Sequence, residues 1–299
     1  MTADIKNLLT AYSQEFNSKL PELFSFPAGP EQRVAAAMKY SVMNGGKRLR
    51  PFLVFETARL FGLDFEQSFP TAAALECLHS YSLIHDDLPA MDNDDLRRGK
   101  PTCHKQFDEA TAILAGNGLL TYAFEILSTQ KGISCETKCE LIKLLASAAG
   151  AFDGMIAGQM LDLYAEKLPA DTDPEPLIKH IEEMKTGRLI RYACEAGAIL
   201  GGASASERQA LIDYSRKIGI AFQIADDILD IEGEQELVGK TLNKDASQGK
   251  VTFVSLYGLE KARGIAAELI AEAGQILDIF GSKANTLRLL ANYIIERKY

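Results

Sequence analysis

The amino-acid sequence predicts an all-α protein, with one domain of about ten helices over residues 1–299. Nearly every long segment repeats apolar residues at intervals of three and four, which is the spacing of one helix face. No segment alternates apolar and polar residues convincingly enough to indicate a half-buried strand. No low-complexity linker divides the chain, so the sequence favours a single helical domain.

The first half of the chain carries clear helix boundaries. The first of these helices places Val34, Met38 and Val42 on one apolar stripe and ends at two glycines. Pro51 is suited to the first turn of the next helix, and Pro89 would end or kink the third. These signals predict helices near residues 31–44, 51–61, 71–87 and 106–129.

Capping residues mark the second half of the chain. Asp173 and Pro174 have the types expected at a helix N-cap and first turn, and Ser206 with Gln209 fits a capping box. Residues 251–257 are β-branched and aromatic enough for a strand, but their helical flanks favour a helix. The predicted helices lie near residues 136–165, 174–200, 206–231, 249–279 and 284–298.

Composition and charge exclude several classes of protein. The 299 residues are 47% hydrophobic and 24% charged, as in a soluble globular protein. The net charge of −9 argues against nonspecific nucleic-acid binding. No apolar run reaches the roughly 18 residues of a membrane span, and the N-terminus lacks a basic region before an apolar signal core. The five cysteines include no CxxC pair and indicate free thiols, so we expect a cytoplasmic protein.

Aspartates crowd the end of the third predicted helix, directly after an apolar run. They are Asp86, Asp87, Asp92, Asp94 and Asp95. So many carboxylates would repel one another strongly unless cations lay among them. Because an apolar run leads straight to these residues, the pattern favours the wall of a cavity over a solvated tail.

A second acidic group lies within residues 222–230. Asp226 and Asp230 are four residues apart and share one helix face, while Gln223 and Asp227 lie on an adjoining stripe. The neighbouring residues are apolar, so unpaired carboxylates on this helix would be costly. Ligands that offer only oxygen atoms at this density suit Mg²⁺ better than zinc.

Basic residues gather at separate positions. Lys47, Arg48 and Arg50 follow a pair of glycines at the junction of two predicted helices. The glycines allow close approach of the backbone, and the helix start offers free N–H groups to an anion. Further basic residues are Arg97, Arg98, Lys185, Arg188, Lys240 and Lys250. Together these side chains are suited to holding phosphate oxygens.

These motifs resemble those of the trans-isoprenyl diphosphate synthases, most closely the bacterial farnesyl diphosphate synthases. DDLPAMD (86–92) is similar to the family's first aspartate-rich motif, DDILD (226–230) to its second, and GGKRLRP (45–51) to its basic motif. The match runs from near residue 30 to residue 260 and extends to the closing helices. It implies a homodimer of all-helical subunits with the isoprenoid synthase fold, in which the helices surround a central cavity.

The resemblance implies that about three Mg²⁺ ions bind at each active site once substrate is present. Asp86 and Asp92 would hold two of the ions, and Asp226 would hold the third. The supporting positions would be Asp87, Asp227 and Asp230.

The resemblance also implies two diphosphate sites. The allylic diphosphate would be held by Arg97, Lys185 and Lys240. Isopentenyl diphosphate would be held by Lys47, Arg50, His79 and Arg98. Thr186 and Gln223 would lie beside the allylic cation, and Lys250 is a further substrate-binding candidate. The candidate catalytic residues are therefore Asp86, Asp92, Lys185, Thr186, Gln223 and Asp226.

The implied reaction condenses isopentenyl diphosphate with dimethylallyl or geranyl diphosphate to give farnesyl diphosphate. Two positions on the first acidic helix bear on product length. Ser82 lies one turn below Asp86 on nearly the same face, and Tyr81 lies about 7.5 Å down the axis on a different face. In the family, an aromatic residue at the position of Tyr81, together with the longer acidic motif seen here, goes with a fifteen-carbon product. The sequence therefore favours farnesyl over geranylgeranyl diphosphate.

The sequence departs from the family pattern at two positions. Asn243 stands where the family often has glycine, and Val254 where it often has proline.

Three other functions remain open at this point. A geranylgeranyl diphosphate synthase would share every motif above. A terpene cyclase would have a different second metal motif and no use for a second diphosphate site. A catalytically silent partner subunit would have lost residues of the acidic motifs, and both motifs are present here.

Overall fold

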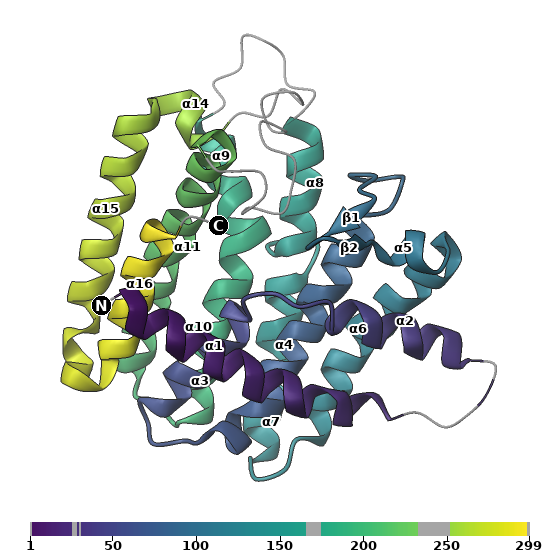
Figure 1. Cartoon of the computed structure of the whole chain (residues 1–299). Helices are drawn as coiled ribbons and strands as arrows, with labels where there is room; N and C mark the ends of the chain where they lie inside the picture. The colour runs from purple at the N-terminus through teal and green to yellow at the C-terminus, as the bar shows by residue number, and fades with distance from the viewer. Residues whose placement is uncertain (1, 26–28, 30, 166–174, 233–251, 298–299) are drawn as a thin grey trace.

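The computed structural model describes residues 2–25, 29, 31–165, 175–232 and 252–297. This part of the chain is almost wholly helical, which confirms the predicted all-α class (Figure 1). The α-helices are α1 (Thr2–Lys19), α2 (Gln32–Val42), α3 (Leu49–Arg59), α4 (Phe65–Asp86), α5 (Cys103–Gln106), α6 (Glu109–Thr129), α7 (Cys135–Ala149), α8 (Met155–Ala165), α9 (Glu175–Glu182), α10 (Arg188–Leu200), α11 (Ala205–Glu232), α14 (Phe253–Tyr257), α15 (Leu259–Ile276) and α16 (Asn285–Glu296). A π-helical turn (Glu183–Gly187) joins α9 to α10, and 3₁₀ segments cover Leu20–Phe24 and Leu277–Ala284.

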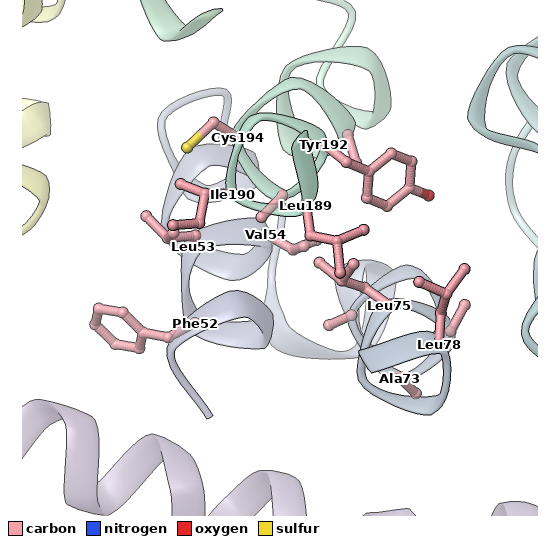
Figure 2. Close-up of a cluster of buried hydrophobic side chains, with 14 of the residues drawn as sticks. Phe52, Leu53, Val54, Ala73, Leu75, Leu78, Leu189, Ile190, Tyr192 and Cys194 are labelled. Carbon is pink, nitrogen blue, oxygen red and sulfur yellow. The ribbon is translucent and has the colours of Figure 1, made fainter. Parts of the chain in front are cut away.

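The centre of the bundle is formed by α4 and α10. In Figure 1, α15 and α16 lie on one side of these helices, and α8 lies on the other with a small β-hairpin. Figure 2 shows side chains of α3, α4 and α10 pointing toward one another, among them Val54, Leu75 and Leu189. These three side chains are at most 1% exposed. Burying each one fully contributes about 1.5–3 kcal/mol, so this contact holds α4 and its acidic end firmly in place.

Helix starts follow local capping chemistry. At the start of α4, the Gln67 backbone N–H donates to the Asp64 carboxylate, and the Asp64 N–H donates to the Gln67 side chain. The predicted capping box at Ser206 is wrong, because the reciprocal hydrogen bonds before α11 join Ser204 and Glu207. The prediction of a helix near residues 251–257 is confirmed by α14. The predicted cap at residues 173–174 lies outside the described residues.

Several predicted boundaries are wrong. The helix predicted over residues 136–165 is divided into α7 and α8, since glycines at positions 150 and 154 interrupt it. The helix predicted over 174–200 is interrupted by the π-helical turn. The hairpin pairs β1 (Leu96–Arg97) with β2 (Lys100–Pro101) in antiparallel register. Strands of two residues are too short to show an alternating pattern in the sequence.

Of the described helices, α6 is long and apolar enough to cross a membrane by length and composition alone. Its residues Ala112, Ala115 and Leu119 are fully buried, and the helix packs mainly against α4 and α2. Packing in the core therefore accounts for the apolar residues on this face of α6.

Candidate active site

A cavity of about 1220 Å³ lies between the acidic ends of α4 and α11. Its wall includes the start of α3, parts of α6 and α8, the π-helical turn and the end of the chain after α16. The predicted site residues that line it are Lys47, Arg50, His79, Tyr81, Ser82, Asp86, Arg97, Arg98, Lys185, Thr186, Gln223 and Asp226. The structure thus brings residues that are more than 170 positions apart in the sequence together around one cavity.

The first acidic motif turns back at the end of α4. The Asp92 backbone N–H donates to the Asp86 carbonyl oxygen at 2.8 Å, so the loop returns to the helix end. Burial raises the pKa of the Asp86 carboxyl to about 6, and the nearby Asp92 carboxylate adds to the rise while Lys185 opposes it. A carboxylate that is partly stripped of water at a cavity wall binds a cation readily, because the cation removes the cost of its burial.

Asp87 has a different surrounding from Asp86. The Asp87 side chain is buried, and the wall of the cavity, as far as the structure describes it, does not include it. Its oxygens accept hydrogen bonds from Arg97 at 2.6, 2.8 and 2.9 Å. Asp87 therefore fixes the guanidinium of Arg97, which itself lines the cavity.

The second acidic motif also divides by position on α11. Asp226 lines the cavity, whereas Asp227 and Asp230 are not part of its described wall. An Asp227 oxygen accepts a hydrogen bond from the Phe253 backbone N–H at 2.8 Å, at the start of α14. Asp230 is only 4% exposed. Asp227 therefore holds the start of α14, and of the three aspartates in this motif only Asp226 belongs to the cavity wall that the structure describes.

Arg297 is a site residue that the sequence reasoning missed. It follows α16, lines the cavity, and donates to the Asp226 carboxylate at 2.7 Å. Its guanidinium carbon lies 3.9 Å from the centre of the Phe222 ring, and a second hydrogen bond reaches the Phe222 carbonyl. Arg297 belongs to none of the motifs identified in the sequence, so its position in the cavity wall becomes evident only when α16 packs against α11.

The basic motif lines the same cavity, with Lys47 and Arg50 near Asp226. Gly46 has φ +113°, and a side chain at this position would lie 2.6 Å from the Arg98 guanidinium carbon. The absence of that side chain lets Arg98 cross the loop and donate to the Gly45 carbonyl. Beside it, the buried Arg48 pairs with the buried Glu76. The glycine pair thus allows two loops, distant in sequence, to form one cationic surface.

Positive charge exceeds negative charge at this wall. Burial lowers the pKa of Arg50, although Glu76 and Asp226 raise it, and among the described residues its buried Nε has no hydrogen-bond partner. Burial and then the neighbouring arginines, Arg50 first, lower the pKa of His79 far below its usual range. Burial, with Arg297 nearby, lowers the pKa of Lys47 to about 8. An anion at this wall would relieve the mutual repulsion of these groups.

The π-helical turn presents Lys185 and Thr186 to the cavity. Lys185 donates to Asp162 of α8 at 2.6 Å. Burial acts to lower the pKa of Lys185, but Asp162, Asp86 and Asp92 together raise it. The turn packs closely on α8, because a Cβ at Gly158 would lie 2.7 Å from the Lys185 Cα. Lys185 therefore stays charged beside Asp162 and the first acidic motif.

The residues fit Mg²⁺ only if another molecule shares the coordination. In the part of the chain that the structure describes, no three His, Cys, Asp or Glu side chains lie close enough to hold an ion together. Mg²⁺ is commonly bound by one or two carboxylates together with substrate phosphates. Asp86 and Asp226 supply oxygen ligands of that kind at the cavity wall. Lys240, Lys250 and Asn243 lie outside the described residues.

The comparison with protein families gives a match over residues 31–294, to the family described as polyprenyl synthetase. The chain belongs to this family. The farnesyl diphosphate synthase of Escherichia coli is 43% identical over 300 residues, covering 98% of this chain and 99% of that protein. A geranylgeranyl diphosphate synthase of Cyanophora paradoxa is 41% identical over 276 residues, covering 91% and 90% of the two chains.

Solved structures of this family have the same fold. The crystal structure of an FPP/GFPP synthase from Zymomonas mobilis in its apo form is 45% identical and gives a TM-score of 0.87. The match covers 99% of this polyprenyl synthetase and 100% of that chain. The predicted isoprenoid synthase fold is therefore confirmed.

Proposed function

We propose that this polyprenyl synthetase is a farnesyl diphosphate synthase, which condenses isopentenyl diphosphate with dimethylallyl or geranyl diphosphate. The observation that carries the proposal is one cavity lined by acidic, basic and apolar side chains. We assign a metal-bound diphosphate to Asp86, Asp226 and Lys185, and a second diphosphate to Lys47 and Arg50, all of which line this cavity. The apolar part of the lining includes side chains of α4, α6 and α8.

We assign the allylic diphosphate to the wall that carries Arg97 and Lys185. As the allylic C–O bond breaks, its electron pair leaves with the diphosphate, and these two cations stabilise the charge that develops there. Mg²⁺ bound at the aspartates would add to this stabilisation by offsetting diphosphate charge. The isopentenyl double bond then attacks the allylic carbon to form a C–C bond, and the released diphosphate can accept the proton that is lost.

The apolar wall protects the allylic cation from water. It includes Leu120 of α6 and Met155, Ile156 and Met160 of α8, and it provides space for the growing hydrocarbon chain. Thr186 and Gln223 also line the cavity, and we propose that they lie beside the cation as it forms.

A product analysis tests the proposed function. The purified protein is incubated with Mg²⁺, radiolabelled isopentenyl diphosphate and a dimethylallyl primer, and the products are separated by chromatography. We expect linear fifteen-carbon chains. Twenty-carbon chains would indicate a geranylgeranyl diphosphate synthase. Cyclic hydrocarbon formed from farnesyl diphosphate would indicate a cyclase, and the absence of turnover would indicate a silent subunit.

Tyr81 is expected to limit product length. It lines the cavity, is 5% exposed, and its ring contacts the His85 ring edge to face at 5.6 Å between centroids. His85 in turn lies against Gly116 of α6, where a side chain would collide with the imidazole. Tyr81→Ala would open the pocket beyond the fifteen-carbon length, and we expect longer chains in the chromatogram.

The control for this experiment is Tyr164→Ala, since Tyr164 is 55% exposed on α8 and outside the described cavity wall. This variant should keep the fifteen-carbon product. If Tyr81→Ala also gives only farnesyl chains, Tyr81 is not the floor of the pocket.

The charge state of Lys47 is expected to limit isopentenyl diphosphate binding at high pH. Its pKa is lowered to about 8 by burial and by Arg297, so the lysine loses its positive charge as the pH rises through that value. We expect kcat/KM for isopentenyl diphosphate to decline above about pH 8, because the free enzyme then binds the anion less well. In Lys47→Arg the guanidinium stays charged, so the decline should disappear. An unchanged decline in this variant would assign it to another group.

We further propose that residues 1–299 form one domain, that the protein acts as a cytoplasmic homodimer, and that it uses about three Mg²⁺ ions per site. The first part is supported by a hydrophobic core that includes buried residues from Ile5 to Ile294. Asp86, Asp92 and Asp226 are the proposed metal ligands. Asp87, Asp227 and Asp230 are proposed to support these ligands. These three residues and Asp92 lie outside the described cavity wall.

A further inference from the structure

One carboxylate beside the cavity has no role in the reaction described above. Glu182 is the last residue of α9 and directly precedes the π-helical turn that carries Lys185 and Thr186. Its side chain accepts a hydrogen bond from Gln223 Nε2 across the helix interface between α9 and α11. Gln223 itself lines the cavity, one turn before Asp226.

The chemistry of a carboxylate fixes the direction of this hydrogen bond. An ionised carboxylate can only accept, so the Gln223 amide must turn its NH₂ group toward Glu182. The Gln223 carbonyl oxygen then lies on the other branch of the amide, away from Glu182. A carbonyl oxygen that faces the cavity stabilises a positive carbon, whereas an NH₂ group in the same place would destabilise it.

We propose that Glu182 is a positioning residue that holds the Gln223 amide with its carbonyl oxygen toward the developing allylic cation. This inference deepens the proposed function and rests on it. Glu182 does not contact the reacting atoms in this arrangement and acts only through Gln223. The hydrogen bond to a charged acceptor is stronger than one between neutral groups, so the amide is fixed before the substrate ionises.

The charges around Glu182 support this role. Lys185 of the π-helical turn, Asp162 of α8 and Asp226 of α11 face it. Burial, with smaller contributions from Asp162 and Asp226, raises the pKa of Glu182 to about 7 against the opposing effects of Gln223 and Lys185. Below that pH the protonated carboxyl could donate to the amide oxygen, and the Gln223 amide would no longer be held in one orientation.

A double-mutant cycle tests the inference. Glu182→Gln keeps the size of the side chain and removes its charge, and we expect kcat to fall about tenfold, less than the loss of a whole charge-stabilising group. The affinity for a thio analogue of dimethylallyl diphosphate, which resists ionisation, should stay within twofold of the wild-type value. In a Gln223→Met background the Glu182→Gln change should have no further effect on kcat, since the amide that it orients is gone.

Glu183→Gln is the matched control. Its side chain is 47% exposed and contacts Arg188 at 3.6 Å, away from Gln223, so kcat should stay at the wild-type value. The ratio of wild-type kcat to Glu182→Gln kcat should rise between pH 6 and pH 8, as Glu182 loses its proton through about pH 7.

Three outcomes would overturn the inference. The first is a Glu182→Gln variant whose kcat is within twofold of the wild-type value. The second is a loss of kcat from Glu182→Gln that is as large in the Gln223→Met background as in the wild type. The third is a weaker affinity of Glu182→Gln for the thio analogue that accounts for the whole loss of activity. Because wild-type turnover is measured in the same assay, failure of the proposed function would be seen separately, as the absence of product from the unaltered protein.

Discussion

Asparagine in place of Asp86 is expected to lower kcat by about a thousandfold. The substitution keeps the shape of the side chain but removes the charge that would draw a divalent cation to the end of α4. Asp86 lines the cavity with a pKa of about 6, so it is ionised at neutral pH although it is partly buried. Without it, charge on the departing diphosphate would be offset less well, and the cost falls on the chemical step.

The measurement is kcat at saturating concentrations of both substrates over a range of Mg²⁺ concentrations. Asp95→Asn is the matched control, because Asp95 is a surface aspartate of the same loop whose side chain is 74% exposed and pairs with Lys105. This control should stay within twofold of the wild type. An Asp86→Asn variant that retains a tenth of wild-type kcat at any Mg²⁺ concentration would contradict the proposed role.

Alanine in place of Gly158 is expected to lower kcat by about a hundredfold. The added Cβ would lie 2.7 Å from the Lys185 Cα and 2.8 Å from the Met184 carbonyl carbon. Both are backbone atoms, so the π-helical turn must move away from α8, and Lys185 and Thr186 must move with it. Overpacking of this kind costs about 1–3 kcal/mol of stability, which leaves the fold intact while it misplaces the two side chains.

Gly264→Ala is the control for Gly158→Ala. No other atom lies within 4 Å of a Cβ at this position in α15, so the variant should keep both stability and kcat. Thermal unfolding of the two variants, followed by helical circular dichroism, separates loss of fold from loss of activity. If Gly158→Ala folds and turns over at the wild-type rate, the position of the π-helical turn is not critical for catalysis.

The two acidic motifs could be placed from the sequence because spacing determines which residues share a helix face. Asp226 and Asp86 lie at one cavity, as the motifs predict. The sequence could not show that Asp87 would turn to Arg97, or that Asp227 would hold the start of α14. These are tertiary contacts between different segments, and the periodicity within one helix does not indicate which other segment will contact it.

The remaining differences have local physical causes. Glu182 was not singled out in the sequence because one glutamate on an amphipathic helix is indistinguishable from a solvated residue until α11 packs against it. Its neighbours Lys185 and Thr186, which the sequence predicts as site candidates, do line the cavity. The π-helical turn that presents them has no sequence pattern as strong as a glycine or proline stop. The capping box before α11 was misplaced by two residues, because Ser204 and Ser206 have the same side chain and only the backbone shows which one is used.

With Asp226 as a proposed metal ligand, its ion pair with Arg297 would make substrate and metal binding depend on each other. If a divalent ion bound Asp226, it would compete with the Arg297 guanidinium, which would then be available to a phosphate group near Lys47. A diphosphate that draws Arg297 away likewise exposes Asp226 to the ion. We therefore expect positive thermodynamic coupling, in which calorimetry gives a tighter Mg²⁺ dissociation constant in the presence of inorganic diphosphate than in its absence, and a smaller difference in Arg297→Met.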